Sequence, residues 1–257
     1  MVMVNSDPMH QFQIHPLFEG LEWNVGGFNL APTNSALFLF IAVFLVIGAL
    51  ALGTASLKTI PGRWQSLTEI WYSFIDGIVK DVNHGHAKAF VPLVFTVFSL
   101  IFAANMLGMF PYFFTATSHI AVTGVMAVAT ILMVVFVGLM KKGLGFFKIF
   151  VPSGVPVVLL LIVTPIEIIS FLSRPISLGM RLFANMLGGH VALKVFAGFI
   201  PSLAGALGGV GMLMGGLLVM PLVVGVTALE FLVAFLQAYV FAMLTCVYLN
   251  DAVGEAH

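Results

Sequence analysis

Long runs of apolar residues, separated by short polar segments, make up most of this chain. The first run without a charge covers residues 36–57, and two more cover residues 89–114 and 120–140. Each is long enough for a helix to cross a hydrocarbon core of about 30 Å. The pattern therefore predicts a first membrane span, followed later by two spans that form a helical hairpin.

The last apolar region, residues 153–250, is interrupted by polar residues and by a glycine-rich run, GFIPSLAGALGGVGMLMGG. A turn or the close approach of two helices would equally explain these glycines. The run after them, from about Leu217 to Leu249, exceeds the roughly 20 residues of a perpendicular span. We expect a pair of long helices here, with the last one tilted, kinked or lying partly along the membrane.

Residues 64–82 follow another pattern, in which apolar side chains recur every three or four positions between polar ones. This period predicts an amphipathic helix. Its two tryptophans, Trp64 and Trp71, suit the headgroup region, so we expect it to lie in the inner membrane interface. The alternative is a helix packed on a soluble domain, but the sequence contains no such domain.

Composition places the chain among integral membrane proteins of the all-α class. Hydrophobic residues make up 61% of its 257 positions and charged ones 8%, against roughly 25% charged in soluble domains. A formal net charge of zero argues against nucleic-acid binding. The single cysteine, Cys246, excludes a disulfide framework and any site with several cysteine ligands. We expect no metal and no cofactor.

The basic residues predict the topology. Seven of the ten fall on one side if the spans alternate, and the positive-inside rule makes that side cytoplasmic. They are Lys58, Arg63, Lys80, Lys88, Lys141, Lys142 and Lys148. Residues 1–35 lack the features of a signal peptide and are expected to form an outer polar tail, with the C-terminus inside. The prediction is a single membrane domain, 1–257, with about five membrane helices and one interfacial helix.

Polar residues gather in one stretch of the apolar C-terminal half, EIISFLSRPISLGMRLFANMLGGH. An ionisable residue inside a bilayer is costly, about 2.5–3.5 kcal/mol for a central arginine on insertion scales, and by default marks a functional site. Arg181 could instead be tolerated through an ion pair with Glu167 or Glu230. Such a pair would leave the other polar residues unexplained, which are Arg174, Asn185, His190 and Gln237.

Helical spacing divides these polar residues between two faces. Arg174 and Arg181 are seven apart and share a face, whereas His190 points to roughly the opposite one. If the last helix runs back beside this one, Glu230 reaches the level of His190, and a Glu–His pair could relay protons. Two partial polar routes with a fixed arginine charge between them would suit proton translocation without leakage, because arginine stays protonated. Asn105 either bonds two helices together or belongs to such a route.

These motifs closely resemble a known family. The segments RPISLGMRLFANMLGGH and ALEFLVAFLQAYVFAMLTCVYL resemble subunit a of the rotary ATP synthases, the stator of their membrane sector. FAANMLGMFPY resembles an earlier polar motif of that family. The resemblance covers most of the chain, is strongest from Glu167 onward, and rests chiefly on the specific motif S-L-x-x-R-L-x-x-N.

The resemblance implies a role for each matching residue. Arg181 matches the family's essential arginine, which faces the rotating ring of c subunits and holds a ring carboxylate ionised. Asn185 matches the asparagine one turn on, and Glu167 the acidic residue of the inner half-channel. Arg174 is a secondary candidate. The last two helices are then expected to lie tilted along the c-ring.

The resemblance also implies an outer half-channel. His190 and Glu230 match two of its positions, with Gln237 beside them and Asn105 on the earlier motif. Some bacterial members carry Glu first and His second, and the exchange found here keeps one acid and one imidazole. Gly108 stands where some members carry Asp, so an acid at that point of the channel is absent from this sequence.

The implied function is that of a non-catalytic subunit that couples proton flow to ring rotation and ATP synthesis. Its expected partners are the c-ring, b-type subunits of the peripheral stalk, the catalytic sector and membrane lipid. Its expected location is the bacterial inner membrane. One alternative is a self-contained secondary transporter, which the lack of a repeated half argues against. Another is an intramembrane hydrolase, for which the sequence holds no G-x-S-x-G or H-E-x-x-H motif.

Overall fold

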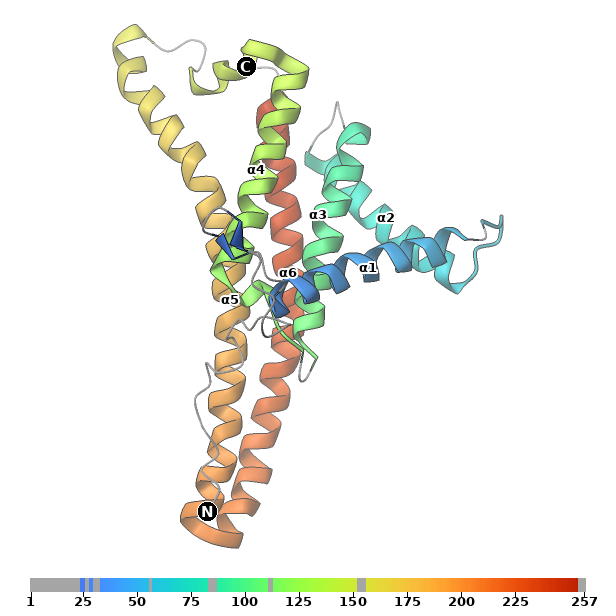
Figure 1. The fold of residues 1–257 in the computed structure, drawn as a ribbon, viewed down its shortest axis with the longest axis vertical. Coiled ribbons are helices and arrows are strands. Elements are labelled where there is room, and N and C mark those ends of the chain that lie inside the picture. Colours follow the sequence, from blue (N-terminus) through green and yellow to red (C-terminus); the bar gives the residue numbers. More distant parts are fainter. Residues whose placement is uncertain are drawn as a thin grey trace. The chain divides into compact units, whose positions relative to one another are not determined.

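The computed structural model describes residues 24–25, 28–29, 33–55, 57–82, 87–110, 113–151 and 156–253, and helices dominate it (Figure 1). The helices are α1 (Asn34–Thr54), α2 (Arg63–Val82), α3 (Ala87–Gly108), η2 (Ala116–Ser118), α4 (Ile120–Lys142), η3 (Gly143–Phe150), α5 (Val157–Met214), η4 (Gly215–Val219) and α6 (Met220–Val253). One small antiparallel ladder joins β1 (Asn24–Val25) to β2 (Phe28–Asn29). The all-α membrane fold predicted from the sequence is confirmed, while most of the expected outer tail lies outside the described residues.

The chain forms two compact units, and α1, α3, α5 and α6 each contribute to both. Unit 1 comprises residues 1–43, 102–119 and 182–237. Unit 2 comprises residues 44–101, 120–181 and 238–257. The single membrane domain stays a prediction of the sequence.

Four helical stretches among the described residues are long and apolar enough to cross a membrane. They are Asn34–Thr54, Ala89–Gly108, Ile120–Lys142 and the 95-residue stretch Leu159–Val253, which contains α5 and α6. The expected second span was too long, because α3 ends at Gly108 rather than at residue 114. Its last turn tightens there through bonds from the amides of Met109 and Phe110 to carbonyls three residues earlier.

The glycine-rich run is where the chain turns back from α5 toward α6, within unit 1. Gly208 has φ 59° and ψ −135°, a conformation that a residue with a Cβ rarely adopts. A Cβ on Gly211 would meet the carbonyl oxygen of Leu203 at 1.8 Å, so the backbone after the turn presses on the backbone before it. Gly215 approaches Ile200 in the same way, at 3.3 Å. The run thus combines a turn with close helix packing.

Helix α6 has 34 residues, or about 51 Å at 1.5 Å per residue. That length exceeds the apolar core of a bilayer. The overlong final helix predicted from the sequence is therefore present. Its tilt along a ring of partner subunits stays a prediction.

In unit 2, the amphipathic helix α2 packs on α3 through aromatic side chains. The indole Nε1–H of Trp71 donates to the Ser99 hydroxyl at 2.9 Å, and its ring lies 5.1 Å from that of Phe98. Phe74 also contacts Phe98, with 5.7 Å between ring centroids. Trp64, by contrast, is 61% exposed, as an interfacial helix needs.

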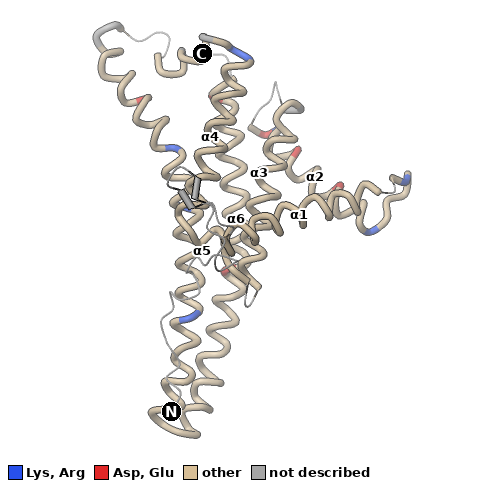
Figure 2. Tube along the Cα trace, viewed as in Figure 1, with Lys and Arg blue, Asp and Glu red and all other residues tan. Residues whose placement is uncertain are grey.

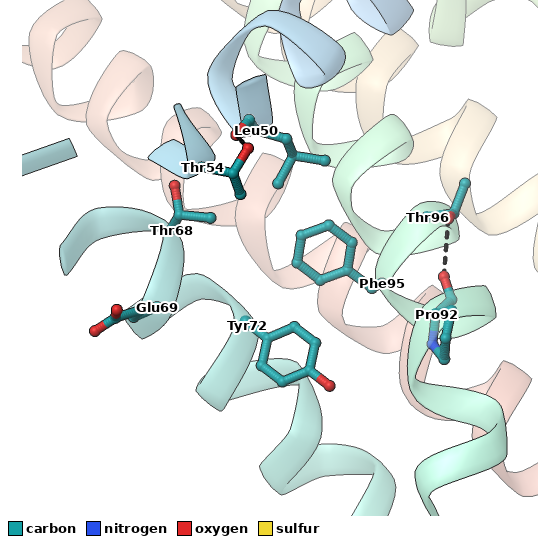
Figure 3. Close-up of a pocket in the computed structure, with 8 residues that line it drawn as sticks. All are labelled: Leu50, Thr54, Thr68, Glu69, Tyr72, Pro92, Phe95 and Thr96. Carbon is teal, nitrogen blue, oxygen red and sulfur yellow. Dashed lines mark hydrogen bonds between the residues drawn. The ribbon is translucent and has the colours of Figure 1, made fainter. Parts of the chain in front are cut away.

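Between α1, α2 and α3 the same unit has an open hollow of about 630 Å³ (Figure 3). Its walls are mainly apolar, and the Thr96 hydroxyl turns away to bond the Pro92 carbonyl of its own helix at 2.8 Å. It is lined by Leu50, Thr54, Thr68, Glu69, Tyr72, Pro92, Phe95 and Thr96. None of these residues belongs to the intramembrane polar groups described next.

Helices α4 and α5 approach closely in unit 2, just before Arg181. A Cβ on Gly179 would lie 3.1 Å from the carbonyl oxygen of Thr123 on α4 and 3.4 Å from Ala127. Leu178, beside it, is only 1% exposed. This contact fixes the packed side of α5 two residues before Arg181, whose own side chain is exposed.

Candidate functional site

Charged residues are sparse along the trace of the long helices (Figure 2), so each polar contact inside them stands out. In unit 1, His190 on α5 faces Glu230 on α6, with 3.0 Å between Nδ1 and Oε1. Both side chains are buried, at 9% and 4% exposure. The two helices run antiparallel here, so residues 40 apart in sequence meet. The Glu–His pair expected from helical spacing is therefore present.

The other ring nitrogen of His190 meets a residue that the sequence analysis did not select. Nε2 lies 3.0 Å from the Oγ1 of Thr115, in the segment just before η2. The Thr115 hydroxyl also donates to the carbonyl oxygen of Gly108, at 3.2 Å. Both nitrogens of the imidazole thus have defined neighbours, one from α6 and one from the segment that follows α3.

Two glycines make room for these contacts. A Cβ on Gly108 would stand 2.5 Å from the Thr115 methyl group and 2.9 Å from its hydroxyl oxygen. A Cβ on Gly189 would stand 2.6 Å from Oε1 of Glu230. Real Cβ contacts are longer, so each glycine is required for the side chain that lies over it.

A second polar pair joins the same helices in unit 1. The Asn185 amide donates to Oε1 of Gln237 at 2.7 Å. Asn105 on α3 is fully buried, and its amide donates to the Ala234 carbonyl on α6 at 3.2 Å. Asn105 therefore bonds two helices together, as one of its two sequence interpretations expected.

Several polar atoms near these pairs are buried without a hydrogen-bond partner among the described residues. They are Oδ1 of Asn105, Nε2 of Gln237 and both carboxyl oxygens of Glu230, of which Oε1 lies 3.0 Å from Nδ1 of His190. A buried polar atom that lacks a partner costs about 1–3 kcal/mol. Such atoms are few in native interiors, and a cluster of them calls for an explanation.

The segment before α4 also carries His119. Its ring stacks on that of Phe114, with 5.0 Å between centroids and 15° between planes. Burial lowers the pKa of His119 from its usual 6.5, because a buried imidazole is harder to charge. His119 therefore favours its neutral form at the end of the segment that contains Thr115.

In unit 2, Arg174 on α5 has a partner that the sequence analysis did not identify. Its Nη1 donates to Oδ2 of Asp251, near the end of α6, at 3.0 Å. The guanidinium also lies over the ring of Tyr248, 4.7 Å from its centroid. Cation–π contact and ion pair together account for this arginine within the chain.

Arg181, seven residues further on, differs from Arg174. Its side chain is exposed, and among the described residues it forms no hydrogen bond or salt bridge. Glu167, in the same unit, is half-buried and forms no ion pair with it. The alternative in which Arg181 is neutralised by Glu167 is wrong for this structure.

The structure thus brings together His190 with Glu230, and Asn185 with Gln237. It leaves Glu167 and Arg181 without a hydrogen bond or salt bridge in the described part of the chain. Thr115 and Asp251 were missed because neither stands out in sequence: one is a threonine in a loop, the other an acid near the C-terminus. No three histidine, cysteine or acidic side chains gather as a metal site within the described ranges.

Comparison with known proteins gives one consistent family. The family model described as ATP synthase A chain matches residues 36–250. The ATP synthase subunit a of Mesorhizobium japonicum is 53% identical over 98% of this chain and 98% of its own length. The subunit a of Hyphomonas neptunium is 50% identical over the whole of both chains. That of Allorhizobium ampelinum is 52% identical over 97% of this chain and 98% of its own.

Proposed function

Because the chain belongs to the ATP synthase A chain family, we propose that it is the stator that couples proton flow to rotation of a c-ring. The family role is that of a multi-pass membrane subunit of an ATP synthase. The finer proposal is that Arg181 faces the ring and that two offset polar routes lead to it from opposite sides of the membrane.

The observation that carries this proposal is the contrast between the two arginines of α5. Arg174 has an acidic partner, Asp251, inside the chain, whereas Arg181 is exposed and has none among the described residues. An arginine left unpaired within a membrane helix is costly. A carboxylate on another chain would offset that cost, and a ring of c subunits presents one such carboxylate on each subunit.

For the outer route we propose the two polar pairs of unit 1, of which His190–Glu230 is buried while Asn185 of the other is exposed. His190 and Glu230 lie 3.0 Å apart and both titrate, so they can pass a proton between them. Asn185, Gln237 and Asn105 extend the polar lining. The buried atoms without partners, such as Oδ1 of Asn105, support a hydrated path, since water would satisfy them.

For the inner route we propose Glu167, which is the single acidic residue of α5. Protons would enter past His190 and Glu230, protonate a ring carboxylate, and leave past Glu167 after nearly a full revolution of the ring. Arg181 would prevent direct passage between the routes, because its guanidinium cannot release a proton. Arg174, paired with Asp251, would anchor the inner end of the helices.

The proposed partners are the c-ring, the b-type subunits of the peripheral stalk and, through the complex, the catalytic sector. The proposed location is the bacterial inner membrane, with the N-terminus outside and the C-terminus cytoplasmic. Seven of the ten lysines and arginines lie between the spans of unit 2 or at their ends, which supports a cytoplasmic position for these segments. Each proton crossing 100 mV releases about 2.3 kcal/mol, so several must pass for each ATP.

The test is proton flux in inverted membrane vesicles that contain the assembled complex with Arg181→Ala. We would record ATP-driven acidification and then passive proton flux after the catalytic sector is removed. The expected result is loss of ATP-driven acidification with normal amounts of complex in the membrane. The matched control is Arg174→Ala, which also removes one arginine from α5. It should keep most of the pumping, because Arg174 pairs with Asp251 of the same chain rather than with the ring.

Full pumping by the Arg181→Ala complex would refute the proposed role of Arg181. Equal losses of pumping in Arg181→Ala and Arg174→Ala would show that removing either arginine of α5 has the same effect, and would contradict a special role for the exposed one. A self-contained transporter would behave differently again, since the purified chain alone would move protons in liposomes.

A further inference from the structure

We propose that Thr115 is a positioning residue that holds His190 in one tautomer, so that only the Nδ1 nitrogen exchanges a proton with Glu230. This inference rests on the proposed outer route. Thr115 would add to that route an uncharged residue that does not titrate and that lies outside α5 and α6.

Three successive contacts link the carboxyl group of Glu230, the imidazole of His190, the hydroxyl of Thr115 and the carbonyl of Gly108. Nδ1 of His190 lies 3.0 Å from Oε1 of Glu230, and Nε2 lies 3.0 Å from Oγ1 of Thr115. Oγ1 of Thr115 lies 3.2 Å from the carbonyl oxygen of Gly108. All three side chains are at least nine-tenths buried, with Thr115 only 5% exposed. They form a chain from a backbone carbonyl to a carboxyl group.

The direction of the hydrogen bonds in this chain follows from proton counting. A hydroxyl has one hydrogen, and a carbonyl oxygen can only accept. Thr115 therefore gives its hydrogen to Gly108 and presents a lone pair to His190. Nε2 of His190 must then carry a hydrogen, in both the neutral and the charged ring. The backbone of α3 thus sets the tautomer of a side chain on α5.

With Nε2 protonated throughout, a single proton remains to be shared on the other side of the ring. It resides on Oε1 of Glu230, giving a carboxylic acid and a neutral imidazole, or on Nδ1, giving a carboxylate and an imidazolium. Transfer breaks one O–H bond and forms one N–H bond, and it needs no other reactant. Without the Thr115 acceptor the neutral ring could place its hydrogen on Nδ1 and leave Nε2 bare, and Nδ1 could then not accept the proton of Glu230.

The surroundings of His190 contain two further groups that titrate. Lys194, one turn along α5, acts on His190 as a like charge. His119 belongs to the segment that holds Thr115 and favours its neutral form. Neither replaces the Thr115 hydroxyl, since Lys194 is only a donor and the Nε2 hydrogen of His190 needs an acceptor.

The absence of a side chain at Gly108 determines where the Thr115 side chain lies. That side chain lies directly over Gly108, where any Cβ would come within 2.5 Å of the methyl group. A residue with a side chain at position 108 would therefore displace the hydroxyl from Nε2. The absence of an acid at Gly108, noted as a departure from some relatives, is the condition for this contact.

The test uses membrane vesicles in which the complex has assembled with Thr115→Val or Thr115→Ser and from which the catalytic sector is then removed. It compares the pH profiles of their passive proton flux. Valine keeps the shape and removes the hydroxyl, so Nε2–H loses its acceptor in both forms of the ring, and the imidazolium loses the stronger, charge-assisted bond. The difference between the two bonds corresponds to about one pH unit. The half-maximal pH should therefore move about one unit toward acid with valine. Serine, which keeps the hydroxyl, should behave like the wild type. Thr117→Val is the matched control, because it removes another fully buried hydroxyl of the same segment and should leave the midpoint unmoved.

A uniform loss of flux with Thr115→Val at every pH, without a shift, would mean that Thr115 only fills space and would overturn the proposal. An unchanged profile would also overturn it. If the valine variant does not accumulate in the membrane, Thr115→Ala removes the same hydroxyl with less steric demand and must give the same shift. Wild-type vesicles without proton flux would instead refute the proposed function, so the two failures are distinguishable.

Discussion

Replacing Gly189 with alanine should separate the Glu230–His190 pair without removing either partner. The new methyl group would lie 2.6 Å from Oε1 of Glu230 and 3.0 Å from its Cγ. The ordinary limit of such contacts is 3.4 Å, so moving from 2.6 Å to that limit displaces the carboxylate by about 0.8 Å. The displaced atom is the one that contacts Nδ1 of His190.

The magnitude follows from the short distance between the partners. Oε1 and Nδ1 are 3.0 Å apart, and a hydrogen bond weakens beyond about 3.2 Å. A misplacement of about 1 Å can lower the rate of a positioned step roughly 100-fold. We therefore expect at least a tenfold loss of ATP-driven proton pumping in the Gly189→Ala complex. Fold stability should change little, because the end of a glutamate side chain moves at small cost.

The preceding residue supplies a matched control. A Cβ on Gly188 would meet nothing within 4 Å, so Gly188→Ala makes the same change on the same turn of α5 without touching Glu230. Both substitutions favour the helix by a similar amount, up to about 1 kcal/mol. The assay is acidification of inverted vesicles, normalised to the amount of complex. Equal pumping by the two alanine variants would refute the reasoning that this pair relays protons in the geometry described.

Three other predictions concern stability. Gly138→Ala should lower the thermal stability of the purified complex by about 1–3 kcal/mol, since its Cβ would meet the Phe146 ring at 2.5 Å; Gly124→Ala on the same helix, which meets nothing within 4 Å, should not. Asp251→Asn should cost less than about 1 kcal/mol in a denaturation midpoint and leave pumping intact, because the ion pair with Arg174 is partly exposed. The pKa of His119 is lowered in the fold, so the unfolded chain binds more protons and stability falls as pH drops below about 6.5. His119→Phe should make stability depend less on pH below about 6.5. An equally steep loss of stability in this variant and the wild type would contradict the contribution of His119.

The sequence was sufficient for everything that depends on local period and on spacing along one helix. Apolar runs predicted the spans because length and composition decide whether a helix can cross a bilayer. The approach of Glu230 to His190 was predictable on the condition that one turn brings α6 back beside α5. The position of that turn was not, and it depends on Gly208, whose positive φ is one of many possibilities in a run with several glycines.

Contacts made by loops could not be predicted in the same way. Thr115 lies in a segment between α3 and η2 where no period constrains the side chains. The last apolar run of the sequence ends at about Leu249, yet α6 continues to Val253 and brings Asp251 to Arg174. In both cases the missing information is where a helix ends, which is the least certain part of any assignment from sequence.

His190 also explains why the glycines beside the polar residues matter as much as the polar residues. Each nitrogen of its ring is faced by a side chain that lies over a glycine: Thr115 over Gly108, and Glu230 over Gly189. A methyl group at either glycine would displace one of the two neighbours while leaving every charge in place. An inventory of ionisable residues therefore identifies the members of such a relay but not its geometry. The geometry depends on two positions where a side chain is absent, and those positions are where substitutions should separate proton transfer from the mere presence of an acid and an imidazole.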